Sequence, residues 1–170
     1  MTSCDKSLRL RAMEPEDLEL IYRIENDPDF WRHGSTTVPY SRYALRQYME
    51  SAQNDLFADG QVRLVIEVEG RAIGLADLTN FDALHRRAEV GLALLPEHQG
   101  HHHGAEIVSQ LCAYARRTGL HQIYATIAVT NQPATHLFRQ QGFTQTASLK
   151  DWLRISDSFV DAVVWQLLLD

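Results

Sequence analysis

The sequence has 170 residues, 45% of them hydrophobic and 22% charged, and its formal net charge is −6. This length suits one domain with a sizeable core, and the sequence shows neither a membrane-length apolar run nor a signal-peptide pattern. The acidic balance argues against nucleic acid, because a phosphate backbone requires a basic surface. We therefore expect one cytoplasmic domain, residues 1–170, with no nucleic-acid or membrane partner.

The first half of the chain combines alternating apolar strands with two helical segments. Pro15 and the acids around it indicate the start of the first helix, and Asp27-Pro28 indicates its end. The segment 30–40 shows neither the apolar spacing of a helix nor that of a strand, and it carries Trp31 and Tyr40 beside Gly and Pro. We therefore interpret it as a functional loop that contacts substrate. The elements expected here are a strand at 8–12, helices at 14–26 and 41–53, a hairpin of strands at 63–68 and 72–79, and a strand at 87–95.

The second half begins with a periodic apolar segment of helix length. Residues 104–117 place apolar side chains on one face, and Thr118-Gly119 ends that helix. A buried strand, a short helix closed by Gly142 and two final strands follow, at 122–129, 133–141, 143–153 and 160–169. The sequence thus predicts seven strands and about four helices, a composition of the α/β (α+β) class.

A loop rich in His and Gly separates the strand that ends at Pro96 from the helix that begins at Gly104. The first amides of a helix have no intrahelical partner and carry the positive end of the dipole, so they attract an anion such as phosphate. Neither the Gly-Lys-Ser/Thr loop of nucleotide triphosphatases nor the Gly-x-Gly-x-x-Gly fingerprint is present.

The loop Gln99-Gly100-His101-His102-His103-Gly104 resembles the pyrophosphate loop, Gln/Arg-x-x-Gly-x-Gly/Ala, of the GNAT N-acetyltransferase superfamily. The segment 131–143 and the order of elements resemble this family as well. The resemblance implies the family's fold, a mixed, mostly antiparallel seven-stranded sheet flanked by about four helices. The stretch 85–89 is similar to the branch of spermidine N-acetyltransferases and ribosomal-protein N-terminal acetyltransferases. The resemblance implies an acyltransferase that moves an acetyl group from acetyl-CoA to a small-molecule amine, a polyamine or a protein N-terminus by direct attack, without a metal.

The same resemblance implies which residues bind the cofactor. These are Leu92, Ala93 and Leu94 along the pantetheine, Gln99, Gly100, His101, His102, His103, Gly104 and Ala105 at the pyrophosphate, and Asn131 and Phe138 on the facing helix. The family usually has Gly at the position of His102, so this loop requires either a positive φ at His102 or a distorted backbone. Asn131 can also cap the helix that follows it.

Four histidines near this loop, His98 and 101–103, raise the alternative of a metal site, because imidazole is a common ligand. Consecutive loop residues cannot all point at one ion, and no Cys or carboxylate pair completes a familiar set. We therefore expect no metal, while keeping a His-rich metal-binding protein as a rival hypothesis.

Glu89 is the expected catalytic residue. It shares a strand face with Gly91 and Ala93, which leaves space beside its carboxylate. The resemblance assigns to this position the relay of the amine proton through water, and the structural alternative is an ion pair with Arg86 or Arg87. Asp77 on the preceding strand is a candidate for binding the substrate ammonium.

Phe138 stands where many members of the family have a Tyr that protonates the departing thiolate. Water can serve instead, since a thiol pKa of about 8.5 lies close to neutral, and Tyr124 and Tyr40 are further candidates. The alternative function is a non-catalytic acyl-CoA-binding module. Polar or basic residues rather than acids flank Pro39-Tyr40, which weakens a polyamine acceptor. The exposed edge and final strands are compatible with a homodimer.

Overall fold

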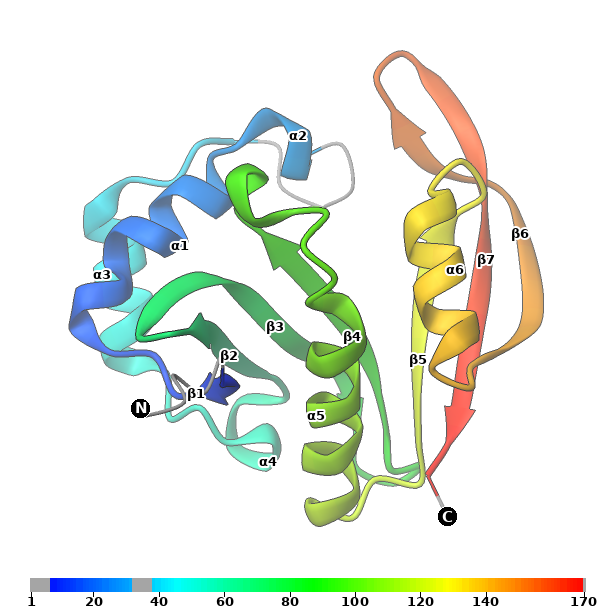
Figure 1. The fold of residues 1–170 in the computed structure, drawn as a ribbon, viewed down its shortest axis with the longest axis horizontal. Coiled ribbons are helices and arrows are strands. Elements are labelled where there is room, and N and C mark those ends of the chain that lie inside the picture. The colour runs from blue at the N-terminus through cyan, green and yellow to red at the C-terminus, as the bar shows by residue number, and fades with distance from the viewer. Residues whose placement is uncertain (1–6, 32–37, 170) are drawn as a thin grey trace, which may run out of the picture.

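The structure is a computed structural model that describes residues 7–31 and 38–169, apart from the side chain of Trp31 (Figure 1). The strands are β1 (Leu8–Arg11), β2 (Val62–Val68), β3 (Arg71–Asp82), β4 (Arg87–Leu94), β5 (Gln122–Ala128), β6 (Thr144–Ile155) and β7 (Ser158–Leu168). The α-helices are α1 (Leu18–Glu25), α2 (Pro28–Trp31), α3 (Arg42–Ser51), α4 (Leu56–Asp59), α5 (Gly104–Arg117) and α6 (Gln132–Gln140), and short 3-10 helices cover Pro15–Asp17 and Pro96–His98. None of the helices in these described parts is long and apolar enough to cross a membrane.

All seven strands form one sheet in the order β1-β2-β3-β4-β5-β7-β6. Every neighbouring pair is antiparallel except β4 and β5, which run parallel. The prediction of a mixed, mostly antiparallel seven-stranded sheet is therefore confirmed. The four longer helices correspond to the four predicted ones.

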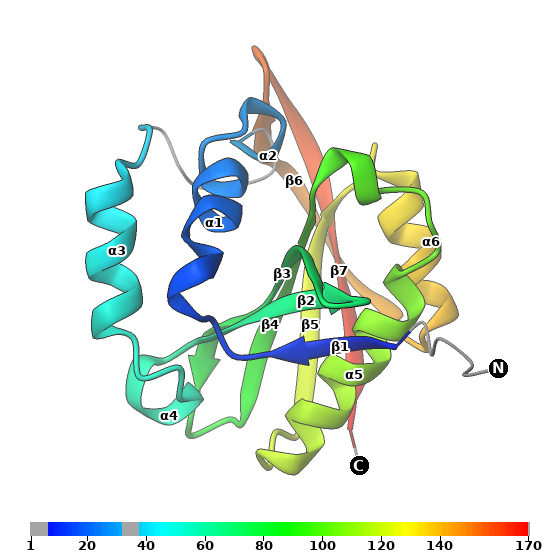
Figure 2. The ribbon, with the colours of Figure 1, turned by 60° about the vertical axis from the view of Figure 1, so that its left-hand side comes forward.

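Two hydrophobic clusters cover the two faces of the sheet. Val90 of β4 packs with Ile107 and Leu111 of α5 in the larger cluster, whereas Ala93 packs against the smaller cluster under α1 and α3. Figure 2 shows α1 and α3 on one side of the sheet and α5 on the other. Neighbouring residues of β4 thus point to opposite faces, as the alternating pattern predicted.

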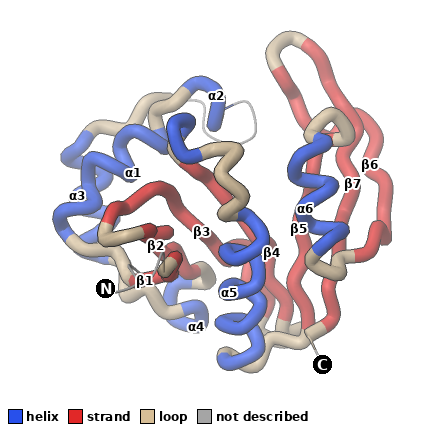
Figure 3. The backbone as a smooth tube through the Cα atoms, viewed as in Figure 1, coloured by secondary structure: helices blue, strands red, loops and turns tan. Residues whose placement is uncertain are grey.

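The parallel contact between β4 and β5 is short. Only three register pairs join the strands, from Arg87↔Gln122 to Glu89↔Tyr124. Beyond them β4 continues beside β3 and β5 continues beside β7, so the sheet forks at its centre. Figure 3 shows the halves diverging toward the end where α2 and the β6–β7 hairpin lie.

Two short helices differ from the sequence expectation. The first helix ends at Glu25, and Pro28 then begins α2, so part of the segment predicted as an irregular loop is helical. Residues 32–37 of that segment lie outside the described residues. The sequence analysis missed α4, which Asp55 caps by accepting the amides of Phe57 and Ala58.

Candidate active site

A cleft of about 1190 Å³ occupies the fork between β4 and β5. Its described walls come from β3, β4, β5, α2, the start of α5, α6 and the end of the β6–β7 hairpin. The residues that the sequence predicted as site members and that line this cleft are Asp77, Glu89, Leu92, Leu94, Gln99, Gly104, Asn131 and Phe138. The fork therefore brings together residues that are up to 61 positions apart, from Asp77 to Phe138.

The β4 wall presents backbone amides to the cleft. Leu95 donates its amide to the Ile73 carbonyl at 2.9 Å, toward β3. Because successive amides of a strand alternate in direction, those of Leu94 and Leu92 point toward the side where β5 has diverged. The Leu94 carbonyl on this side accepts Gln99 Nε2 at 3.0 Å, which ties the following loop to the strand end.

The loop after β4 adopts left-handed backbone at two positions, Gly100 with φ 76° and His102 with φ 62°. The prediction of a positive φ at His102 is confirmed. His103 follows with φ −76° and ψ −20°, and α5 begins at Gly104. Alternation between left- and right-handed residues turns successive amides toward one side, and this arrangement binds anions well. His101, His102 and Ala105 are exposed on the loop and first turn.

The imidazoles of His101 and His103 stack with ring centroids 6.2 Å apart. Burial and the neighbouring histidines His101, His98 and His102 lower the pKa of His103, because each disfavours its cationic form. Among residues 7–31 and 38–169, no group of three or more His, Cys, Asp or Glu side chains is arranged to hold a metal ion.

The wall opposite β4 is formed by α6. Asn131 accepts the Ala134 amide at 3.2 Å and so caps this helix, as the sequence suggested. Phe138 is buried, lies at the cleft wall and packs edge-on against Phe143 with centroids 4.9 Å apart. Leu137 reaches across to α5, where a Cβ added to Gly104 would lie 2.8 Å from Leu137 Cδ2. Gly104 therefore permits the close approach of α5 and α6 beside the cleft.

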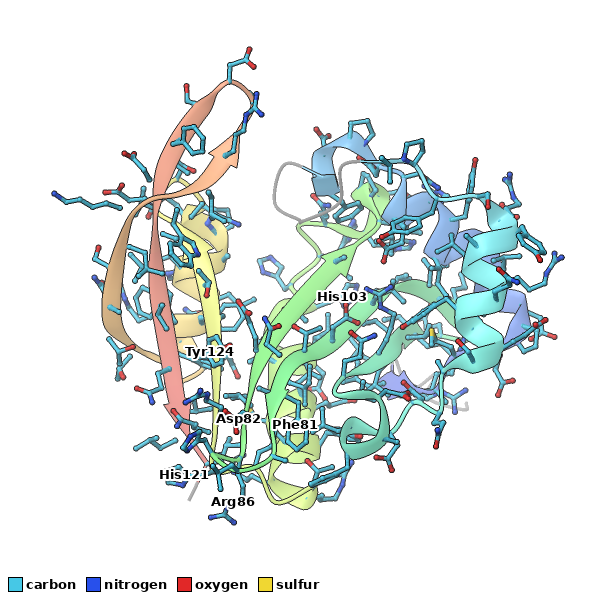
Figure 4. All side chains as sticks on the ribbon, turned by 180° about the vertical axis from the view of Figure 1, so that it is seen from behind. Phe81, Asp82, Arg86, His103, His121 and Tyr124 are labelled. Carbon is cyan, nitrogen blue, oxygen red and sulfur yellow. The ribbon has the colours of Figure 1, made fainter. Side chains whose placement is uncertain are left out.

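Glu89 is half-buried at the base of the fork. Its Oε2 accepts Asn80 Nδ2 at 2.6 Å. Arg87 pairs with Asp82 at 3.1 Å, and the described part of the chain contains no ion pair from Glu89 to Arg86 or Arg87. Figure 4 shows Arg86, Asp82 and His121 gathered at the end of the sheet away from the hairpin tip. The structural alternative for Glu89 therefore has no support in the geometry.

Asp77 lies opposite Gly91 on β4 and opposite Arg63 on β2. Arg63 donates Nε and Nη2 to the two Asp77 oxygens at 3.0 and 2.8 Å and also contacts Glu25. A two-bond Arg–carboxylate pair of this kind is strong and directional. Asp77 thus reaches the cleft as a carboxylate already paired with a cation.

Other predicted site residues lie away from the described cleft wall. The Ala93 side chain faces the smaller core on the far side of the sheet. Tyr40 exchanges backbone hydrogen bonds with the Asn26 side chain at 2.7 and 3.0 Å and is absent from the described lining. The Trp31 side chain lies outside the described residues. Phe30, at the start of the predicted functional loop, does line the cleft, as do Trp152 and Arg154, which sequence reasoning missed.

A mixed sheet that forks between two parallel strands, with a loop of left-handed residues opening a helix at the fork, defines the class of acetyl-CoA-dependent N-acetyltransferases. A family model described as the acetyltransferase (GNAT) domain matches residues 7–144. The chain therefore belongs to the GNAT acetyltransferase family.

Similar proteins with assigned activities fall within this family. A spermidine N(1)-acetyltransferase of Vibrio cholerae is 28% identical over 159 residues, covering 92% of this chain and 90% of the relative. The L-amino acid N-acyltransferase MnaT of Escherichia coli is 33% identical over 110 residues, covering 63% and 64%. The crystal structure of the Vibrio cholerae spermidine enzyme in complex with CoA and spermine has a TM-score of 0.83, with 28% identity and 95% of each chain covered.

Proposed function

We propose that this protein transfers the acetyl group of acetyl-CoA to a primary amine by direct attack in a ternary complex. The observation that carries the proposal is the fork at Glu89, beyond which β4 offers amides and side chains to a cleft instead of to a neighbouring strand. A thioester that lies in this fork meets amide donors on one wall and a carboxylate at its base. Acyl transfer requires this combination of positioned donors and a proton acceptor.

The proposed cofactor path runs from the loop into the fork. The pyrophosphate would lie on the amides of residues 100–105, where left-handed backbone at Gly100 and His102 precedes the start of α5. The pantetheine would follow Leu92 and Leu94, with Asn131 and Phe138 opposite. The amide of Leu92 or Leu94 would polarise the thioester carbonyl, because both point into the opening.

Glu89 is proposed as the proton relay. An alkylamine with a pKa near ~10.4 is protonated at neutral pH and must lose a proton before its nitrogen attacks the thioester carbon. The ammonium first passes one proton through water to Glu89. The C–N bond then forms and the C–S bond breaks, and the second proton leaves the nitrogen through water for the thiolate, which departs as the free thiol. This role is supported by the position of Glu89 at the cleft and by its lack of an arginine partner in the described residues.

Titration of acetyl-CoA by calorimetry, followed by measurement of thiol release with a panel of primary amines, tests the proposal. We expect micromolar-range or tighter binding and acetylation of at least one amine class. The second candidate is a non-catalytic acyl-CoA-binding module, which Phe138 favours because its ring has no proton to donate. Binding without thiol release for any amine would select that candidate, and absence of binding would contradict both.

A further inference from the structure

The end of the β6–β7 hairpin contains a bulge with two extra residues on β6. Leu149 is opposite Ala162 and Leu153 is opposite Val160, so residues 150–152 face Asp161 alone. Asp151 within the bulge has φ 47°, a left-handed conformation that is uncommon for any residue other than Gly. Bulges next to active sites commonly redirect side chains.

Asp161 holds this bulge in place. Its Oδ1 accepts the Asp151 amide at 2.9 Å, and its carbonyl accepts the Val129 amide at 3.0 Å from the end of β5. The bulge is therefore fastened to the strand that forms one side of the fork. Figure 1 shows the hairpin projecting past the sheet at the end where α2 lies.

β6 contributes to the cleft Trp152, which lies in the bulge, and Arg154, which follows the bulge in register with Phe159. Arg154 lies 3.9 Å from Asp157 Oδ1, and the side chains are 68% and 102% exposed, respectively. An ion pair with this exposure and distance contributes little, because water screens it. Arg154 thus brings to the cleft a cation that is available for a ligand.

The charged side chains along the described cleft wall are Asp77, Glu89 and Arg154. Arg63 already pairs with Asp77 through two hydrogen bonds, which leaves Glu89 as the carboxylate without a cationic partner. A polyamine carries several cations and no anion, so it requires several free carboxylates. This wall instead offers one free carboxylate and one guanidinium.

We infer that the acceptor is a primary amine that also carries a carboxylate, as a free amino acid does, and that Arg154 binds this carboxylate. The inference rests on the proposed acetyltransferase function and names its substrate class. Guanidinium and carboxylate match in shape and form paired hydrogen bonds, so Arg154 would select such acceptors and orient their amine toward the base of the fork. Arg154 would also disfavour a polycationic acceptor by charge repulsion.

Matched acceptors test the inference directly. L-Phenylalanine and phenethylamine share one skeleton and differ in the carboxylate, as do L-lysine and cadaverine, and spermidine completes the set. Thiol release from acetyl-CoA measures kcat/KM for each. The expected result is at least tenfold higher kcat/KM for one or both carboxylated members than for the amine without the carboxylate, and low activity with spermidine.

The Arg154→Gln variant tests the assigned residue. It should raise the KM for the carboxylated acceptor roughly tenfold or more, leave the KM for acetyl-CoA unchanged and reduce the preference within each matched pair. Lys150→Gln is the matched control, because Lys150 lies on the same strand, is exposed and is absent from the described cleft wall. It should behave like the wild type.

Three other results would overturn the inference. Efficient acetylation of spermidine or cadaverine with poor use of the amino acids would overturn the substrate class while leaving the acetyltransferase function intact. An unchanged KM in Arg154→Gln would overturn the role of this side chain. Binding of acetyl-CoA without transfer to any amine would overturn the proposed function, and the inference with it.

Discussion

Glu89 and Tyr124 form the last register pair between β4 and β5, directly before the strands separate. Burial, and then the negative charge of Glu89, raise the pKa of the Tyr124 phenol, while Arg87 acts in the opposite direction. The phenol therefore keeps its proton at neutral pH beside a carboxylate. The base of the fork holds one group that can accept a proton and one that can donate a proton.

The Tyr124 phenol should titrate above its ordinary value of 10.0. Because the unfolded chain releases this proton first, the free energy of unfolding should fall as pH rises through and above that value. Glu89→Gln should shift the titration back toward the ordinary value, leaving the effect of burial. Site-resolved NMR of labelled tyrosine measures the titration in the wild type and in the variant, and Tyr124→Phe identifies the Tyr124 signal. A tyrosine signal that does not respond to Glu89→Gln would contradict the electrostatic coupling.

Glu89→Gln should lower turnover by roughly 10²-fold or more, the scale typical of losing an acid–base group. Binding of acetyl-CoA should barely change, because the carboxamide keeps the shape of the side chain. Wild-type rates should rise with pH as more free amine becomes available, and the variant should lose most where that fraction is smallest. Steady-state kinetics over a pH series measures this.

The matched control for this change is Glu50→Gln on the exposed face of α3, which removes the same charge far from the cleft wall. Its rate should equal that of the wild type. Normal turnover of the Glu89→Gln enzyme at every pH on a verified acceptor would contradict the proton-relay role and leave Glu89 with a structural role.

Gly104→Val should weaken acetyl-CoA binding by about tenfold or more with a small change in melting temperature. An added Cβ would lie 2.8 Å from Leu137 Cδ2, so the end of this flexible, half-buried side chain has to shift at the cleft wall, while the larger side chain takes up space beside the start of α5. Helix propensity does not oppose the change, since Gly is the weaker helix former. Calorimetric titration and thermal unfolding, with Ser109→Val on the exposed face of α5 as control, separate the two effects. Undiminished affinity would show that the cofactor does not approach this helix start.

His102→Gly should raise the free energy of unfolding slightly and preserve or improve acetyl-CoA affinity. A non-glycine residue at φ 62° carries strain of about 1 kcal/mol, which Gly relieves. The control is His101→Gly at a neighbour outside the set of described positive-φ residues, where added backbone freedom should destabilise by roughly 0.5–1 kcal/mol. Chemical denaturation and titration measure both variants. A large loss of affinity that zinc modulates would instead indicate a metal role for this histidine.

Local patterns determined much of this fold. The helix at 104–117 begins and ends where its apolar period and Thr118-Gly119 predicted, and Asn131 caps α6 as its position suggested. These features depend on neighbours within a few residues, so they can be predicted from the local sequence pattern. Family resemblance likewise led us to expect Glu89 and the loop after β4 in one site, and Glu89, Gln99 and Gly104 do line one cleft.

Long-range pairing determined what sequence reasoning missed. Arg154 lies at the cleft on β6, beyond a bulge that Asp161 holds, and this placement depends on strand pairing that no local sequence pattern shows. Arg63 neutralises Asp77 from a neighbouring strand, 14 positions away. Short helix α4 depends on the cap at Asp55 rather than on an apolar stripe, and a four-residue helix is too short to show one.

The early separation of β4 from β5 gives the sheet internal edges in addition to its two outer ones at β1 and β6. Outer edges favour aggregation, because their unpaired amides can form hydrogen bonds with strands of other chains. Here the amides of Leu92 and Leu94 face a cleft that is lined by residues of α5 and α6 rather than an outer edge of the sheet. In the cofactor-free protein these amides should exchange with deuterium faster than those paired to β3, and a bound pantetheine should slow them. In the proposed binding mode, the pantetheine of acetyl-CoA occupies the place of a missing strand between β4 and β5.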